Sequence, residues 1–391
     1  MKPDWLRWPE TRALVEAFSP GQLRFVGGGV RDALLGREVK DVDAATPLLP
    51  EAVMALLREA GIKAVPTGIA HGTITAVIDG KSFEITTLRH DVSTDGRHAR
   101  VEYTDDWQQD AARRDFTMNA LYLSPEGELF DYFSGENDAK AGYVRFIGEA
   151  AARIKEDYLR ILRFFRFYAW YGRGAPDAGA LAACADLAGH IESLSGERVQ
   201  QEMMKLLTAE NPIPALAPMR KHGIAPYVFG GGIDETALAQ VKPLEAAIKS
   251  PPLPLARLSA IIADAKQAAW IGQRWRLSND DRALLKESMR VIPADTPLAE
   301  QKKILRETGT EVFVHRVMAS AARTGEASPC RAMIHLPQNW QPPEFPVGGD
   351  DLIARGVAPG KQMGELLRRL EKEWEASGYR LTKEQLLAKA P

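Results

Sequence analysis

Three consecutive glycines, Gly27 to Gly29, lie between a short apolar segment, residues 23–26, and a helix-like run. Glycine permits positive φ angles and lets a ligand approach the backbone closely. A turn from a strand into a helix directs free N–H groups outward, where they attract anions. Arg31 adds a cation just after the turn. The segment therefore predicts a phosphate-binding turn in which Gly28, Gly29 and Arg31 contact the ligand.

Two carboxylates, Asp41 and Asp43, follow this turn with one residue between them. On a strand, residues two apart point to the same side, so both acids would face one ligand. Carboxylate oxygens beside a phosphate site are donors that Mg²⁺ accepts in phosphoryl chemistry. Taken alone, an Asp-X-Asp pattern is more often an exposed turn or strand edge. Its closeness to the glycine turn favours a magnesium site made by Asp41 and Asp43.

A third acid, Glu84, lies on a strand expected over residues 82–88. That strand returns from one over residues 72–78 through Asp79-Gly80, a pair typical of hairpin turns. Alternation places Glu84 on the side of the sheet away from its apolar neighbours. Glu84 could face the two aspartates from a neighbouring strand, or it could be an ordinary exposed glutamate.

Residues 89–101 are polar, and this composition predicts a flexible loop that leaves the sheet. The segment 110–115 that follows is dense in arginine and aspartate and includes Arg114. We expect a helix there, on which acids orient guanidinium groups toward a phosphate. Local ion pairs on an exposed helix are the alternative interpretation.

A helix is predicted over residues 151–171, where apolar residues recur with helical spacing. Asp157, Arg160, Arg163 and Arg166 are each three residues apart and form a polar stripe beside the apolar face. Such a stripe could bind a nucleotide, or it could be an exposed ridge of ion pairs.

The chemistry of the bases indicates what Asp157 and Arg160 could recognise. Cytosine and adenine each present an amino donor and a ring-nitrogen acceptor, which match an aspartate acceptor and an arginine donor. Guanine and uracil present a carbonyl acceptor and an N–H donor instead. Each mismatched buried group costs about 1–3 kcal/mol. An Asp–Arg pair would therefore admit CTP and ATP and reject GTP and UTP.

The composition bounds the fold and the setting of the protein. At 391 residues and 45% hydrophobic content, the chain can hold two or three globular domains. A formal net charge of −2 means that a polyanion must be bound by a local patch, not by a basic body. Two distant cysteines, Cys184 and Cys330, suit a reducing compartment. With no apolar run of bilayer length, we expect a cytoplasmic protein that does not enter membranes.

Four motifs in one order resemble a known family. They are Gly27-Gly-Gly-Val-Arg-Asp32, the Asp-X-Asp pair, Phe83-Glu-Ile-Thr-Thr-Leu-Arg89 and Arg113-Arg-Asp-Phe-Thr-X-Asn-Ala120. Together they are similar to the class II tRNA nucleotidyltransferases and bacterial poly(A) polymerases of the DNA polymerase beta superfamily. The resemblance is strong over the first 170 residues and moderate over the last 45.

The resemblance implies an α+β fold, in which an N-terminal nucleotidyltransferase domain with a mixed sheet and helices precedes an all-α neck, body and tail. We expect a catalytic head over residues 1–148, a base-reading neck over 149–225, and a tRNA-binding body and tail over 226–391.

The activity implied is template-independent addition of C, C and A to the 3′ end of tRNA from CTP and ATP, with release of pyrophosphate. Asp41 and Asp43 would hold Mg²⁺, and Glu84 would be a third catalytic acid. The nucleotide would be bound by Gly28, Gly29, Arg31, Arg114, Asp157, Arg160, Arg163 and Arg166. The alternatives are a poly(A) polymerase, an enzyme that adds only CC or only A, and a noncatalytic RNA-binding protein.

Overall fold

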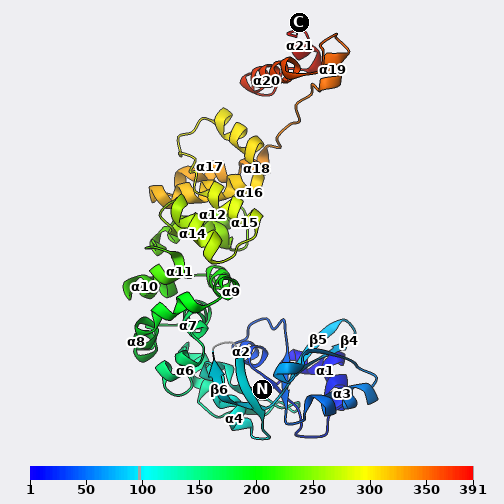
Figure 1. The fold of residues 1–391 in the computed structure, drawn as a ribbon, viewed down its shortest axis with the longest axis vertical. Coiled ribbons are helices and arrows are strands. Elements are labelled where there is room, and N and C mark those ends of the chain that lie inside the picture. Colours follow the sequence, from blue (N-terminus) through cyan, green and yellow to red (C-terminus); the bar gives the residue numbers. More distant parts are fainter. Residues whose placement is uncertain (96–97, 391) are drawn as a thin grey trace. The chain divides into compact units, whose positions relative to one another are not determined.

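The structure is a computed structural model that describes residues 1–95 and 98–390, with only the backbone described at residues 70, 91–95 and 98–101. The chain divides into two compact units, coloured from blue to red along the sequence in Figure 1. Unit 1 comprises Met1–Gly232 and Arg274–Arg276, and unit 2 comprises Ile233–Gln273 and Leu277–Pro391. Within the described residues, no helix has the length and apolarity needed to cross a bilayer.

Unit 1 begins with a mixed β-sheet whose strand order is β3-β4-β5-β2-β1-β8-β9. Neighbouring strands run antiparallel except β2 and β5, which are parallel. The predicted hairpin is confirmed as β4 and β5. The strands are β1 (Arg24–Val26), β2 (Asp43–Thr46), β3 (Lys63–Gly68), β4 (Thr73–Ile78), β5 (Lys81–Thr87), β8 (Leu121–Leu123) and β9 (Leu129–Asp131).

The two faces of the sheet differ because residues alternate along each strand. Phe25, Ala44 and Ile85 belong to one apolar cluster, together with residues of α1 (Pro9–Glu16) and α3 (Pro50–Glu59). Their neighbours in sequence therefore point to the opposite face. Asp43 and Glu84 are among those neighbours, so the sheet presents both acids on the face away from this core.

Residues 89–95 and 98–103 form a second, two-stranded sheet, so the prediction of a loop over 89–101 is wrong. Strand β6 (Arg89–Asp95) pairs with β7 (His98–Tyr103) in antiparallel fashion. Residues 96–97, between these two strands in the sequence, lie outside the described residues. The polar composition concealed the strands because a two-stranded ribbon need not bury either face.

The helix predicted over 151–171 is divided in two, which corrects the expectation of one continuous element. Asp157 ends the first part with extended backbone angles, φ −156° and ψ 107°. The two parts are α6 (Ala150–Glu156) and α7 (Leu159–Tyr171).

The other α-helices of unit 1, besides α1 and α3, are α2 (Gly28–Leu34), α4 (Trp107–Ala112), α5 (Gly135–Ala141), α8 (Ala178–Asp186), α9 (Gly196–Leu207), α10 (Ile213–Lys221) and α11 (Ala225–Phe229).

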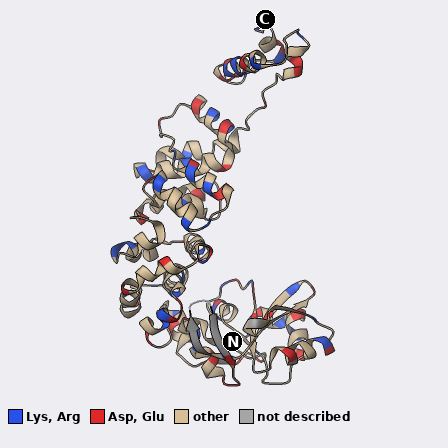
Figure 2. Cartoon of the chain, in the orientation of Figure 1, with Lys and Arg blue, Asp and Glu red and all other residues tan. Residues whose placement is uncertain are grey.

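Unit 2 is built from helices in its described residues, and basic and acidic side chains are interspersed along them (Figure 2). A separate apolar cluster near the C-terminus includes Met363, Leu370 and Trp374, which lie on one amphipathic helix. The helices are α12 (Leu238–Ala247), α13 (Pro254–Ile261), α14 (Ala265–Arg274), α15 (Asn279–Ser288), α16 (Leu298–Thr324), α17 (Arg331–Ile334), α18 (Leu336–Asn339), α19 (Gly349–Ile353), α20 (Lys361–Ala376) and α21 (Lys383–Leu387).

Candidate nucleotide-binding site

The glycine turn between β1 and α2 has two different environments. Gly27 adopts a positive φ of 74° and, with Gly28, lines a cavity of unit 1. Gly29 is buried, and a Cβ placed there would lie 3.0 Å from the backbone oxygen of Asp41. Gly28 thus lies at the cavity wall, whereas Gly29 makes room for the segment that carries Asp41.

Of the three predicted acids, Asp43 and Glu84 lie on neighbouring strands, whereas Asp41 lies outside the sheet. Strand β2 begins at Asp43, so Asp41 precedes the strand instead of lying on it, and its side chain is exposed. Ala44 pairs with Ile85 in the parallel register of β2 and β5, which places Asp43 beside Glu84. Burial raises the pKa of Asp43 to about 6, and the charges of Glu84 and Asp41 add to the rise while Arg114 opposes it.

This donor set fits a hard divalent cation. Within the described residues, no three His, Cys, Asp or Glu side chains form a complete metal cage. Burial is the main cause of the raised pKa of Asp43, and the neighbouring charges of Glu84 and Asp41 add to it. A cation bound by Asp41 and Asp43 would relieve that repulsion, and carboxylate oxygens are the ligands that Mg²⁺ prefers.

Asp110, on α4, orients two arginines. Its Oδ1 accepts a hydrogen bond from Arg113 at 2.7 Å, and its Oδ2 accepts from Arg114 at 3.1 Å and from the Tyr122 hydroxyl at 2.6 Å. Burial alone would raise the pKa of Asp110, but Arg114 and Arg113 outweigh it and lower the pKa to about 2. Helix α4 ends at Ala112, so Arg114 lies in the following turn and not on the helix predicted for it.

Arg31 is buried and bonded on several sides. Its guanidinium donates to Asn119 at 2.6 Å, to the Tyr171 hydroxyl at 2.6 Å and to Asp32 at 2.9 Å. The Asn119 amide in turn donates to Asp115 at 2.9 Å. Arg31 lines the cavity, so its charge reaches a ligand there while its orientation is fixed by these partners.

Arg163 and Arg166, on α7, are held by two buried acids. Arg163 donates to Asp115 at 2.7 Å, and Arg166 donates to Glu202 on α9. Burial alone would raise the pKa of Asp115, but Arg163 and Asn119 outweigh it and lower the pKa to about 2. Both arginines line the cavity.

Asp157 and Arg160 have separate partners. Asp157 accepts from the Leu159 amide at 3.1 Å and from Arg198 of α9 at 2.6 Å. Arg160 donates to Glu156 at the end of α6. Both side chains line the same cavity as Gly28 and Arg31.

The cavity has a volume of about 800 Å³ and an excess of positive charge. Asp43 lines it, whereas Asp41, Glu84 and Gly29 do not. Among the described residues, its lining includes nine basic side chains and three acidic ones. They are Arg31, Arg89, Arg113, Arg114, Arg160, Arg163, Arg166, Arg198 and Lys205, with Asp43, Asp115 and Asp157. Such a lining suits a polyanion that carries several phosphates.

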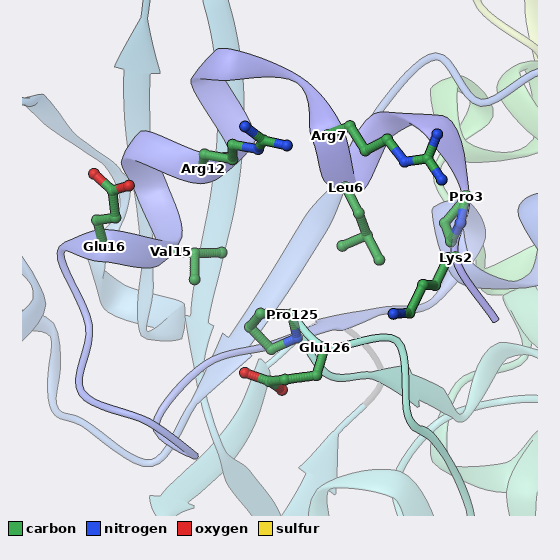
Figure 3. A pocket seen from close by; sticks show the side chains of 9 residues that line it. All are labelled: Lys2, Pro3, Leu6, Arg7, Arg12, Val15, Glu16, Pro125 and Glu126. Atoms are coloured by element: carbon green, nitrogen blue, oxygen red, sulfur yellow. The ribbon is translucent and has the colours of Figure 1, made fainter.

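A second hollow, of about 410 Å³, lies between the N-terminal helices and the turn at Pro125 (Figure 3). Its basic residues Lys2, Arg7 and Arg12 are exposed and accompanied by Glu16 and Glu126. No residue predicted from the sequence to bind a nucleotide lines it. The larger cavity is therefore the candidate site.

Several residues of the site escaped sequence analysis. Arg198, Glu202 and Lys205 lie four and three residues apart on α9 and face the stripe of α7. The spacing places them on one face of a helix, and that pattern is readable in the sequence. Asn119, by contrast, has no signal of its own, because only the fold brings it to Arg31.

Comparison with known proteins identifies relatives along nearly the whole chain. The family model described as the Poly A polymerase head domain matches residues 23–145, and the model described as a probable RNA and SrmB binding site of polymerase A matches residues 177–233. The mouse protein named CCA tRNA nucleotidyltransferase 1, mitochondrial, is 36% identical over 394 residues, which cover 96% of this chain and 88% of the relative. The CCA-adding enzyme of Limosilactobacillus fermentum is 30% identical over 357 residues, which cover 89% of this chain and 87% of the relative.

Solved structures share the fold. The Bacillus stearothermophilus CCA-adding enzyme in complex with CTP matches with a TM-score of 0.73 and 28% identity, over 97% of this chain and 94% of that one. The Thermotoga maritima CCA-adding enzyme complexed with tRNA matches with a TM-score of 0.67 and 19% identity, over 97% of each chain. At that lower identity the likeness concerns the fold alone.

The environments of Gly28 and Gly29 predict that substitution by alanine lowers stability at Gly29 but not at Gly28. Gly29→Ala should lower the free energy of unfolding by about 1–3 kcal/mol, because its methyl group meets the Asp41 backbone. A Cβ at Gly28 would lie 3.7 Å from Arg31, an ordinary contact, so Gly28→Ala should keep the stability of the wild type. Urea unfolding of both variants checks this, and equal losses would contradict it.

The raised pKa of Asp43 predicts that Asp43→Asn stabilises the metal-free protein. At pH 7.5 in EDTA we expect the free energy of unfolding to rise by about 1–3 kcal/mol, because the buried negative charge is removed. The folded-state pKa, about 6, lies above that of an unfolded aspartate, so the folded wild type takes up its proton first on acidification. The difference between variant and wild type should therefore narrow as the pH falls from 7 toward 4.

The measurement is urea unfolding in EDTA across that pH range, with the exposed Asp105→Asn as the matched control. A difference between Asp43→Asn and the wild type that does not change with pH would count against this account of Asp43.

Proposed function

The chain belongs to the family of CCA tRNA nucleotidyltransferases, and we propose that it adds C, C and A to the 3′ end of tRNA from CTP and ATP. Similarity to these relatives over nearly the full chain carries the proposal. The cavity agrees with it, because its excess of arginine suits a triphosphate and Asp157 and Arg160 suit the pairing edge of a base.

In the reaction, the 3′ oxygen of tRNA attacks the α-phosphorus of the bound nucleotide, and the bond to the β-phosphate breaks to release pyrophosphate. Nucleotidyltransferases of this family use a divalent metal, which we propose to be Mg²⁺ held by Asp41 and Asp43. When bound, the metal lowers the pKa of the attacking hydroxyl and neutralises charge on the phosphates. Glu84 stands beside Asp43 and completes the acidic group.

The protein contributes mainly position and charge. Gly28 leaves the backbone open to the phosphates, and Arg31, Arg114, Arg163 and Arg166 supply fixed cations around them. Because carboxylates already orient these guanidinium groups, little reorganisation is needed as negative charge shifts toward the leaving group. Gly29 acts through the position of Asp41 rather than by touching phosphate.

Asp157 and Arg160 choose the base in this proposal. Arg198 fixes the Asp157 carboxylate and Glu156 fixes Arg160, so both present set edges to the cavity. Each carboxylate oxygen can accept more than one hydrogen bond, and Asp157 therefore keeps capacity for the amino group of cytosine or adenine.

We assign catalysis to a head over residues 1–148, base reading to a neck over 149–225 and tRNA binding to a body and tail over 226–391. Charges interspersed along the helices of unit 2 offer contacts to RNA phosphates (Figure 2). A cytoplasmic location stays a prediction, since the animal relatives carry a mitochondrial designation in their names.

A tRNA that lacks its terminal triplet tests the activity. With CTP and ATP together we expect three nucleotides to be added and extension then to stop, and with CTP alone two. The lengths of radiolabelled products on a sequencing gel provide the measurement. A long ladder of A would favour the poly(A) polymerase named by the head-domain family model, and products of only CC or only A would indicate a partial activity.

Asp157→Ala should relax the choice of base more than it weakens triphosphate binding. Removing the acceptor removes the repulsion of the uracil carbonyl, so the preference for CTP over UTP should fall roughly tenfold or more. Steady-state kinetics with each nucleotide measure that preference, and Asp186→Ala, an exposed aspartate of α8, is the control. An unchanged preference would contradict the role of Asp157.

A further inference from the structure

One cation of the cavity differs from the others in how it is held. Arg31 pairs with Asp32, Arg113 and Arg114 with Asp110, and Arg160 with Glu156. Arg163, Arg166 and Arg198 likewise have acidic partners, and Arg89 donates to the His71 carbonyl. Lys205 lines the same cavity, yet among the described residues no carboxylate lies within ion-pair distance of its ammonium group.

The backbone at Lys205 is fixed although its side chain is exposed. The indole Nε1 of Trp170 on α7 donates to the Lys205 carbonyl at 2.7 Å. Helices α7 and α9 pack against each other along this line. Lys205 therefore presents an exposed ammonium group from a fixed point on the cavity wall.

The cavity has two chemically distinct ends along α7. Just before α7 begins, Asp157 is bonded to Arg198, and this is the end assigned to the base. At the last turn, Tyr171 is bonded to Arg31 of the glycine turn, and this is the end assigned to the phosphates. The late residues of α7 also contact Lys205 through Trp170.

Helix α9 spans the same two ends. Arg198 and Lys205 are seven residues apart, which corresponds to about 10 Å along a helix. A nucleoside triphosphate is an elongated molecule with its base at one end and its terminal phosphate at the other. With the base at Asp157, the β- and γ-phosphates extend toward Gly28, Arg31 and Lys205.

From this arrangement, and resting on the proposed function, we propose that Lys205 binds the terminal phosphates of CTP and ATP and the pyrophosphate that leaves. The arginines that are paired with acids hold the nucleotide in place. The positive charge of Lys205 has no carboxylate partner among the described residues, so the phosphates of the bound triphosphate would neutralise it. Lys205 thus contacts the substrate directly and distinguishes triphosphates from nucleotides that lack the outer phosphates.

The test compares CTP with CMP, which shares the base and the α-phosphate but lacks the other two. In Lys205→Met we expect the affinity for CTP to fall roughly tenfold or more and the affinity for CMP to stay as in the wild type. Inhibition by inorganic pyrophosphate should weaken by a similar factor, and Lys205→Arg should restore most of the CTP affinity. Isothermal titration calorimetry on the full chain measures the affinities.

Lys221→Ala, an exposed lysine of unit 1 outside the cavity, controls for the loss of one positive charge. Equal weakening of CTP and CMP, or CTP affinity unchanged with weaker binding of tRNA, would overturn the assignment, the latter in favour of an RNA phosphate. If the wild type itself binds no CTP, the proposed function fails first. If the wild type binds CTP and Lys205→Met binds it equally well, only the role of Lys205 is contradicted.

Discussion

The carboxylate of Asp115 is the point on which the rest of the site depends. It is buried and accepts from Arg163 of α7 and from Asn119, and Asn119 in turn accepts from Arg31 of α2. A single acid therefore fixes cations from the glycine turn and from the helical stripe. Removing one partner of a buried ion pair typically costs about 3–5 kcal/mol, because the other charge is left uncompensated.

The site as a whole is balanced differently on its two sides. On the arginine side, Asp110 and Asp115 have pKa values lowered to about 2, so their charges persist at neutral pH and keep the guanidinium groups oriented. On the sheet side, the pKa of Asp43 is raised to about 6, so its charge is unfavourable in the protein alone. Asp110 and Asp115 therefore organise the arginines of the site, whereas the charge of Asp43 would be stabilised by a bound cation.

The sequence predicted several elements that carry the candidate site because their signals are local. The glycine turn, the hairpin β4–β5 and the stripe of α7 follow from spacing and turn chemistry. What the sequence did not predict depends on contacts between distant segments. Asn119 reaches Arg31 across 88 residues, and Arg198 reaches Asp157 across 41. Gly29 illustrates the same limit, since its type allows both a phosphate contact and the tight packing on Asp41 that the structure shows.

The break between α6 and α7 keeps Asp157 and Arg160 from pairing with each other. In one continuous helix, Asp157 and Arg160 would be neighbours three residues apart, and opposite charges at that spacing attract each other. Such a pair would occupy the groups that must face the ligand. The extended backbone at Asp157 turns its carboxylate to Arg198 on another helix, while Arg160 turns to Glu156. Each side chain is then held by a different residue, and both line the cavity.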